Sequence, residues 1–288
     1  MKKILKNNAI FILSFLILLG FGIFNYAKEV ERVNQNNQLI EKHKLMCQNG
    51  EISNQDYCDT LLQADNNSTD FYYTFNEVSS FGYTRQIIFL LVLFIVVPAL
   101  YYPSKYLKNK AINKKNFEEL KQIIFKSSYK SSFIILGVNL VLFVLCYIYL
   151  GTFEITVSNE AYVNGVPNNL FLAFLVQFIS IYLQSIVCLN LGLIVLSKIK
   201  NYFGAIIFTY ASYWLIEFIL EIFIEGILIN NILKIQYFGR LCSLVNGFVV
   251  PVDALSLICP FIIVLLTGII VYKKYSTYNY FLGKVNTK

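Results

Sequence analysis

Six apolar stretches, each long enough to cross a bilayer as a helix, run through this 288-residue chain. A membrane span needs about 20 mostly apolar residues. The chain is 57% hydrophobic and 14% charged, whereas soluble domains average about 25% charged residues. We therefore predict an all-α integral membrane protein with six transmembrane helices. The predicted spans are Ala9–Ala27, Gln86–Pro103, Phe133–Phe153, Leu170–Leu196, Tyr202–Ile224 and Leu255–Tyr272.

The distribution of Lys and Arg predicts how these spans are oriented, because cytoplasmic loops are enriched in both residues. Most of the 24 Lys and Arg residues lie at the two termini and in the connections 104–132 and 197–201. The connection 154–169 has Glu154 and Glu160 but no Lys or Arg. Both termini are therefore predicted to be cytosolic. The net charge of +7 then reflects topology, and it does not predict nucleic-acid binding because no base-stacking aromatic residues interleave with the lysines.

The predicted topology divides the chain into three parts. Residues 1–27 are the amino terminus and the first span, which we interpret as an uncleaved anchor because its apolar run exceeds a signal-peptide core. Residues 28–85 form a small helical outer segment between the first and second spans. Residues 86–288 form a five-span membrane domain. The richness in Lys, Asn and Ile indicates a bacterial source, so the bacterial plasma membrane is the expected location.

Two of the six cysteines, Cys47 and Cys58, lie in the outer segment. This segment faces the more oxidising side of the membrane, where disulfides form. The turn-like stretch 48–51 separates the two residues, so a disulfide would join two helices into a hairpin. The alternative is a pair of unpaired thiols in a reducing environment.

The connection before the third span predicts a short amphipathic helix within 113–132. Phe117, Leu120 and Ile123 fall on one helical face. Glu118 and Glu119 lie in the first turn, where acidic side chains complement the helix dipole. Such a helix either lies on the inner membrane surface as a connector or docks into a cytosolic partner.

The stretch 94–138 has an order of residues that is typical of one family. An acidic residue precedes a short helix and an aliphatic run, and a small residue and a base follow just before the third span. In this order the stretch resembles permeases of type-2 ATP-binding-cassette exporters. The Gly-Thr that the family has before this helix is missing here, as is the proline after the aliphatic run. The matching positions are Glu119, Leu120, Ile123, Ser127, Ser128 and Lys130.

The resemblance implies two partners besides the lipid bilayer. One is a separate cytosolic ATPase subunit, since the chain contains no G-x-x-x-x-G-K-[ST] pattern for binding ATP itself. The other is a second permease copy or a homologue, with the substrate path between the two chains. The resemblance also implies a re-entrant segment within 226–254. The residues implied to couple to the ATPase are Phe117, Glu118, Glu119, Leu120 and Ile123.

Polar side chains within the spans supply the candidates for a substrate path. Gln177 and Gln184 share one face of the fourth span, which should look inward or toward a second copy. They either bond helices together or line a polar path. Glu217, Glu221 and Glu225 form an acidic stripe on the fifth span, either at its outer end or as an acidic mouth for a cation or cationic substrate. We take Gln177, Gln184, Glu217 and Glu221 as substrate-path candidates.

The sequence also limits the chemistry of the chain. His43 is the only histidine, which argues against the usual zinc sites and His-based triads. We predict no catalytic residue, no cofactor and no metal, and hence no enzyme. The first hypothesis is the membrane subunit of an ATP-driven exporter that moves a peptide, a lipid-like molecule or a small toxic compound. The alternatives are a non-transporting immunity or sensor protein that binds a ligand through its outer segment, and an ion-coupled carrier that uses Glu217.

Overall fold

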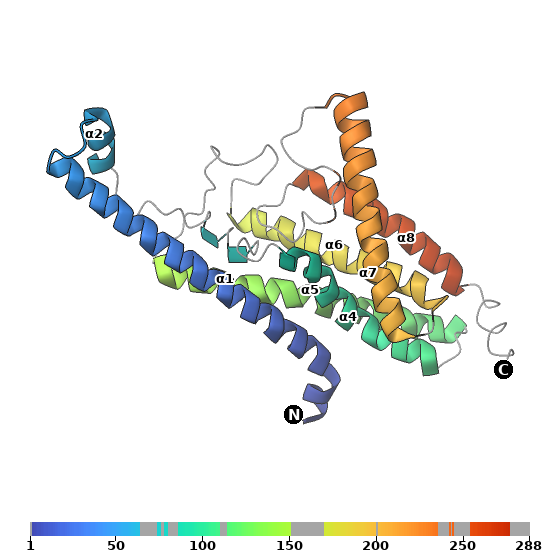
Figure 1. Cartoon of the computed structure of the whole chain (residues 1–288). Coiled ribbons are helices and arrows are strands. Elements are labelled where there is room, and N and C mark those ends of the chain that lie inside the picture. The colour runs from blue at the N-terminus through green and yellow to red at the C-terminus, as the bar shows by residue number, and fades with distance from the viewer. Residues whose placement is uncertain are drawn as a thin grey trace.

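The computed structural model describes residues 2–63, 74–75, 78–79, 86–109, 114–150, 170–199, 201–235, 242, 244 and 254–276. Every regular element in these ranges is a helix (Figure 1). The π-helix η2 (Leu220–Ile232) continues α7, and the 3-10 helix η4 (Ala254–Leu257) leads into α8. The α-helices are α1 (Lys2–Gln48), α2 (Gln55–Gln63), α4 (Gln86–Asn109), α5 (Lys114–Leu150), α6 (Leu170–Leu196), α7 (Tyr202–Ile219) and α8 (Ile258–Ser276).

Five of these helices, α1, α4, α5, α6 and α8, are long and apolar enough to cross a membrane. Large apolar side chains such as Leu16, Leu140 and Leu266 are exposed along them. An apolar surface of this extent suits lipid rather than water, so the chain is a multi-pass membrane protein. The predicted span Tyr202–Ile224 is also helical, on α7 and the start of η2, but it is not among the five, and the count of six crossings stays a prediction.

Helix α1 is much longer than a membrane crossing. Its 47 residues correspond to about 70 Å of helix, at 1.5 Å per residue. The helix continues past the predicted end of the first span at Ala27, where Lys28 pairs with Glu31 at 2.8 Å and Arg32 pairs with Glu29. Such i,i+3 pairs favour helix in a polar sequence. The distal half of α1 therefore projects beyond the bundle as an arm (Figure 1).

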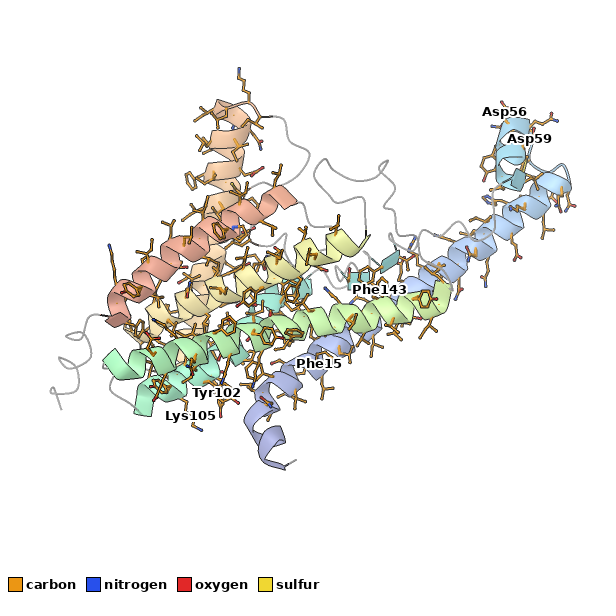
Figure 2. All side chains as sticks on the ribbon, turned by 180° about the vertical axis from the view of Figure 1, so that it is seen from behind. Phe15, Asp56, Asp59, Tyr102, Lys105 and Phe143 are labelled. Carbon is orange, nitrogen blue, oxygen red and sulfur yellow. A yellow bond between two sulfur atoms is a disulfide. The ribbon has the colours of Figure 1, made fainter. Side chains whose placement is uncertain are left out.

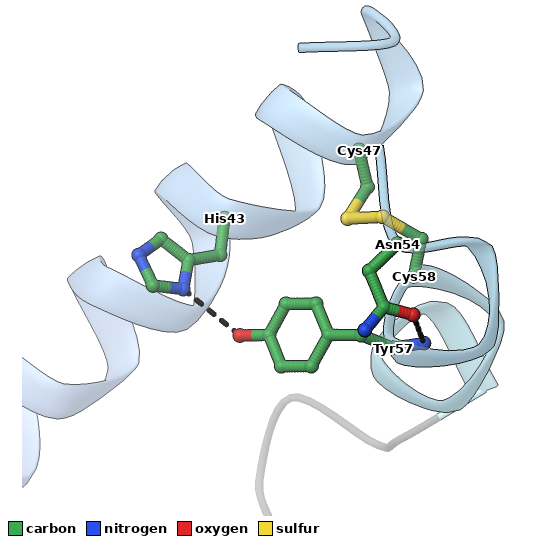
Figure 3. The surroundings of a disulfide bond; sticks show 5 residues. All are labelled: His43, Cys47, Asn54, Tyr57 and Cys58. Carbon is green, nitrogen blue, oxygen red and sulfur yellow. Dashed lines mark hydrogen bonds between the residues drawn. A yellow bond between two sulfur atoms is a disulfide. The ribbon is translucent and has the colours of Figure 1, made fainter. Parts of the chain in front are cut away.

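The tip of this arm is a helical hairpin closed by a disulfide between Cys47 and Cys58 (Figure 3). Gly50 ends α1 with a positive φ of 72°, a conformation that glycine adopts without steric cost. The side chain of Asn54 accepts a hydrogen bond from the backbone N–H of Tyr57 at 3.1 Å, which satisfies the exposed amino end of α2. His43 Nδ1 lies 3.0 Å from the hydroxyl oxygen of Tyr57, so this contact and the disulfide hold α2 against α1.

Helices α1 and α5 run parallel to each other. The Lys130 ammonium donates a hydrogen bond to Asn8 Oδ1 at 2.8 Å near their amino-terminal parts. The Tyr149 hydroxyl donates to Asn34 Oδ1 at 2.9 Å near the end of α5. These two contacts fix the register of a pair that is far apart in sequence.

Helices α6 and α8 are also parallel, because Asn190 contacts Thr267 and Lys274 contacts Ser197 further along both helices. Helices α4 and α7 are antiparallel. The rings of Phe89 and Trp214 lie 4.8 Å apart near one end of this pair, and the Tyr202 hydroxyl donates to the Val97 carbonyl oxygen at 2.6 Å near the other. With short connections after α4 and α6, the direction of the chain alternates from each long helix to the next.

The alternation gathers the basic residues at one end of the bundle, which we call the lysine end. It carries Lys105, Lys130, Lys198 and Lys274. The opposite end, which we call the far end, holds the last turn of α5, the first turn of α6 and the start of α8. Tyr102 and Lys105 lie at the lysine end, while Asp56 and Asp59 lie at the tip of the arm (Figure 2).

Helix α6 lies at the centre of the bundle and contacts α4, α5, α7 and α8. It packs tightly against α4 at Gly192, where an added Cβ atom would overlap with Cδ2 of Leu100. Leu100 is fully buried, so only glycine fits at this position without moving a neighbour. The core therefore lies around α6, which is where the candidate residues Gln177 and Gln184 also lie.

The predicted cytosolic helix within 113–132 is not a separate element, and this part of the prediction was wrong. Helix α5 runs unbroken for 37 residues into the predicted third span. The hydroxyls of Ser128, Ser131 and Ser132 donate to backbone carbonyls three or four residues earlier, a bonding mode that accommodates serine inside a helix. Because no Gly or Pro occurs in α5 before Gly137, nothing in the sequence ends the helix before the span.

The predicted re-entrant segment 226–254 lies largely outside the described residues. Its first part, 226–232, belongs to η2, so the helix begun by α7 extends past the predicted end of the fifth span at Ile224. Its last residue, Ala254, begins η4. Between these elements the structure describes 233–235, Cys242 and Leu244.

Candidate functional site

Uncharged polar side chains lie buried in the middle and far half of the bundle. Gln177, Gln184 and Tyr213 are fully buried, and Asn139 is 2% exposed. Neither side-chain polar atom of Asn139 or Gln177 has a hydrogen-bond partner among the described residues, and the same holds for Gln184 Oε1 and the Tyr213 hydroxyl. Gln184 makes one long contact, from Nε2 to Ser180 Oγ at 3.5 Å.

The spacing of polar residues along α6 explains why these side chains point inward. Gln177, Ser180 and Gln184 recur at three and four positions, which places them on one helical face. Leu172 and Leu175 are exposed on the other side of the helix. A bilayer favours this orientation, because apolar side chains then meet lipid and polar ones face protein. The face that carries Gln177 and Gln184 was expected to look inward or toward a second copy. In the structure both side chains are buried among the helices of one chain.

The missing partners make this group a candidate binding site. A buried polar group without a hydrogen bond costs about 1–3 kcal/mol. Asn139, Gln177 and Tyr213 belong to three different helices, α5, α6 and α7. Water or a polar part of a substrate that donates and accepts hydrogen bonds would satisfy each of these side chains. The four residues Asn139, Gln177, Gln184 and Tyr213 are called the buried polar group below.

The acidic residues of α7 and η2 anchor another part of the chain. Glu217 and Glu225 are 3% and 7% exposed. Glu217 Oε2 accepts a hydrogen bond from the backbone N–H of Leu244 at 2.6 Å, and Glu225 Oε2 accepts one from that of Cys242 at 2.9 Å. Both carboxylates therefore hold Cys242 and Leu244 against α7 and η2.

Glu221 is placed differently from the other two members of the predicted acidic stripe, since its side chain is partly exposed. The stripe assumed an α-helix, in which residues four apart share a face. Glu221 and Glu225 instead lie in the π-helix η2, whose i→i+5 bonding puts more residues in each turn. Glu217 and Glu225 are buried, and each accepts a backbone N–H from Leu244 or Cys242, whereas Glu221 is partly exposed.

The residues implied to couple to an ATPase differ in how accessible they are to a partner. Leu120 is fully buried, Ile123 is half-buried, and Glu119 Oε2 accepts a hydrogen bond from the Tyr106 hydroxyl at 2.8 Å. Glu118 is exposed and pairs with Lys121 at 2.6 Å. Phe117 lies on α5, but its side chain is outside the described residues.

A partner could therefore reach Glu118 but not Leu120. The neighbouring surface of α5 includes Phe125, which is 63% exposed, and Tyr129, which is 47% exposed. Sequence reasoning did not name these aromatic residues, because it chose the helical face of Phe117, Leu120 and Ile123 for the contact with a partner. We call the surface formed by Glu118, Lys121, Phe125 and Tyr129 the α5 surface.

Sequence reasoning also missed Tyr213 as a site residue. A tyrosine in an apolar span is usually an interface residue, and only the packing of α7 shows that Tyr213 is fully buried. Within the described residues, no group of three or more His, Cys, Asp or Glu side chains is arranged to hold a metal ion.

Comparison of this chain with protein-family models, with curated proteins and with solved structures finds no match. The function is therefore inferred from the chain's own residues. Its main elements are the buried polar group, the carboxylates of Glu217 and Glu225, and the α5 surface.

Proposed function

We propose that this chain is the membrane-spanning subunit of an ATP-driven exporter that takes its energy from a separate cytosolic ATPase. In this proposal the chain crosses the bacterial plasma membrane six times, with both termini and the lysine end in the cytosol. The alternating helix directions support an even number of crossings if α7 also crosses the membrane, in addition to the five helices named above. The gathering of Lys105, Lys130, Lys198 and Lys274 at one end supports the orientation through the positive-inside rule.

The single observation that carries the proposal is the buried polar group. Polar side chains in the middle of a membrane protein are costly and are a common mark of a substrate or ion pathway. The members here are uncharged, which suits a polar but uncharged part of a peptide or small molecule. The resemblance to exporter permeases implied a path between two copies. Because Gln177 and Gln184 are fully buried within one chain, we instead propose a path inside each copy.

The α5 surface supplies the proposed contact with the ATPase. It lies at the lysine end, before the apolar part of α5, and combines charged side chains with exposed aromatic rings. Exposed Phe and Tyr flanked by charges are typical of the buried anchors of protein interfaces. Helix α5 continues without a break to the far end. A displacement of the α5 surface by the ATPase would therefore be transmitted along the helix to Asn139, which belongs to the buried polar group.

Co-purification from native membranes tests the proposal. The wild-type chain is expected to retain an ATP-hydrolysing protein, and Phe125→Ala combined with Glu118→Lys is expected to lose it. Leu140→Ala is the matched control, because Leu140 lies on the same helix and is 64% exposed against 63% for Phe125. The proposal is wrong if no ATP-hydrolysing protein accompanies the wild-type chain, or if the control and the double variant lose it equally.

The arm favours a second candidate function, a non-transporting immunity or sensor protein. The disulfide and the contact between His43 and Tyr57 stiffen its tip, while Leu39 and Leu45 remain exposed on it. This candidate predicts that replacing Leu39 and Leu45 with Ser abolishes function while the α5 surface variants do not. An ion-coupled carrier based on Glu217 is less well supported, because this carboxylate already accepts the N–H of Leu244.

A further inference from the structure

Cys242 and Cys259 form a pair of neighbouring thiols at the far end. Cys242 lies between η2 and η4, and Cys259 lies in the first turn of α8. The thiol of Cys259 is hydrogen-bonded to the sulfur of Cys242. The two remaining free cysteines, Cys146 and Cys188, are buried in the bundle on α5 and α6.

The position of Cys242 is fixed by its backbone as well as by its thiol. Its N–H donates to Glu225 Oε2 at 2.9 Å, and the N–H of Leu244 donates to Glu217 Oε2 at 2.6 Å. These two bonds fix Cys242 and Leu244 against η2 and α7. The pairing of the two thiols is therefore part of the packed structure.

Exposure differs between the two members of the pair. Cys259 is 7% exposed, whereas Cys242 is partly exposed. Reagents outside the protein can therefore reach Cys242 first. The pair also lies at the end of the bundle from which the arm with its Cys47–Cys58 disulfide projects.

We propose that Cys242 and Cys259 are a redox site that closes to a second disulfide and links Cys242 covalently to α8. Its formation in cells rests on the orientation given under the proposed function, in which the far end faces the oxidising side. The oxidant is an external disulfide, carried by a small molecule or by a disulfide-exchanging protein.

The step is a thiol–disulfide exchange in two stages. The Cys242 thiolate, having released its proton to water, attacks one sulfur of the external disulfide and displaces a thiolate. The Cys259 thiolate then attacks the Cys242 sulfur of this mixed disulfide and releases the second thiolate. The two cysteines lose two electrons and two protons in total, and the external disulfide is reduced to two thiols.

Differential alkylation of the full-length chain in intact cells tests the inference. Free thiols are blocked with N-ethylmaleimide under denaturing conditions, disulfides are then reduced, and the released thiols are labelled with iodoacetamide before mass spectrometry. We expect iodoacetamide on Cys242 and Cys259, and N-ethylmaleimide on Cys146 and Cys188. Without reduction, a linked peptide pair containing Cys242 and Cys259 is expected. Cys242→Ser should free Cys259, and the control Cys188→Ser should leave the bridge intact.

The labels on Cys47 and Cys58 show whether a negative result rules out the redox site alone or the proposed orientation as well. If Cys47 and Cys58 carry iodoacetamide but Cys242 and Cys259 carry N-ethylmaleimide, the redox site is wrong and the orientation stands. If all four carry N-ethylmaleimide, the far end is not on the oxidising side, and both the orientation and the inference fail. A linked peptide that joins Cys242 to any cysteine other than Cys259 would also overturn the inference.

Discussion

The buried amide side chains of α6 differ between the two halves of the bundle. At the lysine end, Asn190 donates to Thr267 at 3.1 Å, Lys274 donates to Ser197 at 2.6 Å, and each of these bonds ties α6 to α8. In the middle and far half, Gln177 and Gln184 lie on the same helix, yet Gln177 has no hydrogen-bond partner in the described part of the chain and Gln184 has one long contact.

This difference separates polar residues that hold the fold from those available for function. Hydrogen bonds between membrane helices contribute about 0.6–1.7 kcal/mol each, so the bonds of Asn190 and Lys274 stabilise the packing of α6 against α8. We call these two bonds the latch. Unpartnered buried amides lower stability, so their presence in the other half needs another explanation. A hydrated or substrate-filled path supplies one. The following predictions test this comparison.

The largest effect is expected at the tip of the arm. Cys47→Ser removes the disulfide to Cys58, and a bridge over so short a loop contributes about 3 kcal/mol. Hydrogen exchange should therefore accelerate in α2 and at the end of α1. Exchange in α6 and α8 should not change, because the arm is separate from the bundle core. Faster exchange throughout α6 would show that the two regions are not independent.

The next effect is expected where α6 meets α4. Gly192→Ala would bring a methyl group into overlap with Leu100 Cδ2, and overpacking of a core costs about 1–3 kcal/mol. Gly20→Ala is the matched control, since a methyl group added at Gly20 would have no neighbouring atom within 4 Å. The midpoint of unfolding in detergent should fall for Gly192→Ala only. Equal midpoints would contradict the close approach of α4 and α6.

A smaller effect separates the latch from the buried polar group directly. Asn190→Leu should lower the free energy of unfolding by about 1 kcal/mol, because it breaks the bond to Thr267. Gln177→Leu should leave this free energy unchanged or raise it, because it removes an amide without a partner among the described residues. The same Gln177 variant should lose ATP-driven activity in liposomes. A Gln177→Leu chain that is as destabilised as Asn190→Leu would assign Gln177 a structural role.

The sequence predicts most of the helices but not which side chains of neighbouring helices contact each other. The span Leu170–Leu196 coincides with α6, because its apolar run is continuous and bounded by polar residues. The inward face of Gln177 and Gln184 also follows from spacing alone. The partners of these residues do not, since whether an amide meets a hydroxyl, as Asn190 meets Thr267, depends on the rotation and register of neighbouring helices.

Three expectations depended on local patterns that are compatible with more than one structure. The helix within 113–132 was expected to be short, but serines that bond to the preceding turn are compatible with a longer helix, and α5 is unbroken. Leu120 has the periodicity of an exposed docking face and also of a core face, and tertiary packing buries it. The spacing of Glu217, Glu221 and Glu225 revealed neither the π-helix nor the contacts with Cys242 and Leu244 that cover two of the three carboxylates.

Water access to the buried polar group is the most direct test of the proposed path. Gln177→Cys and Leu175→Cys are made in a chain whose free cysteines are replaced by Ser, and each is treated with a permanently charged methanethiosulfonate reagent. Gln177 is fully buried in the protein, whereas Leu175 is 47% exposed on the lipid-facing side. We predict that the thiol at position 177 reacts and the thiol at position 175 does not. If position 177 is unreactive, or both positions react at the same rate, the bundle encloses no polar path and the proposed function loses its main support.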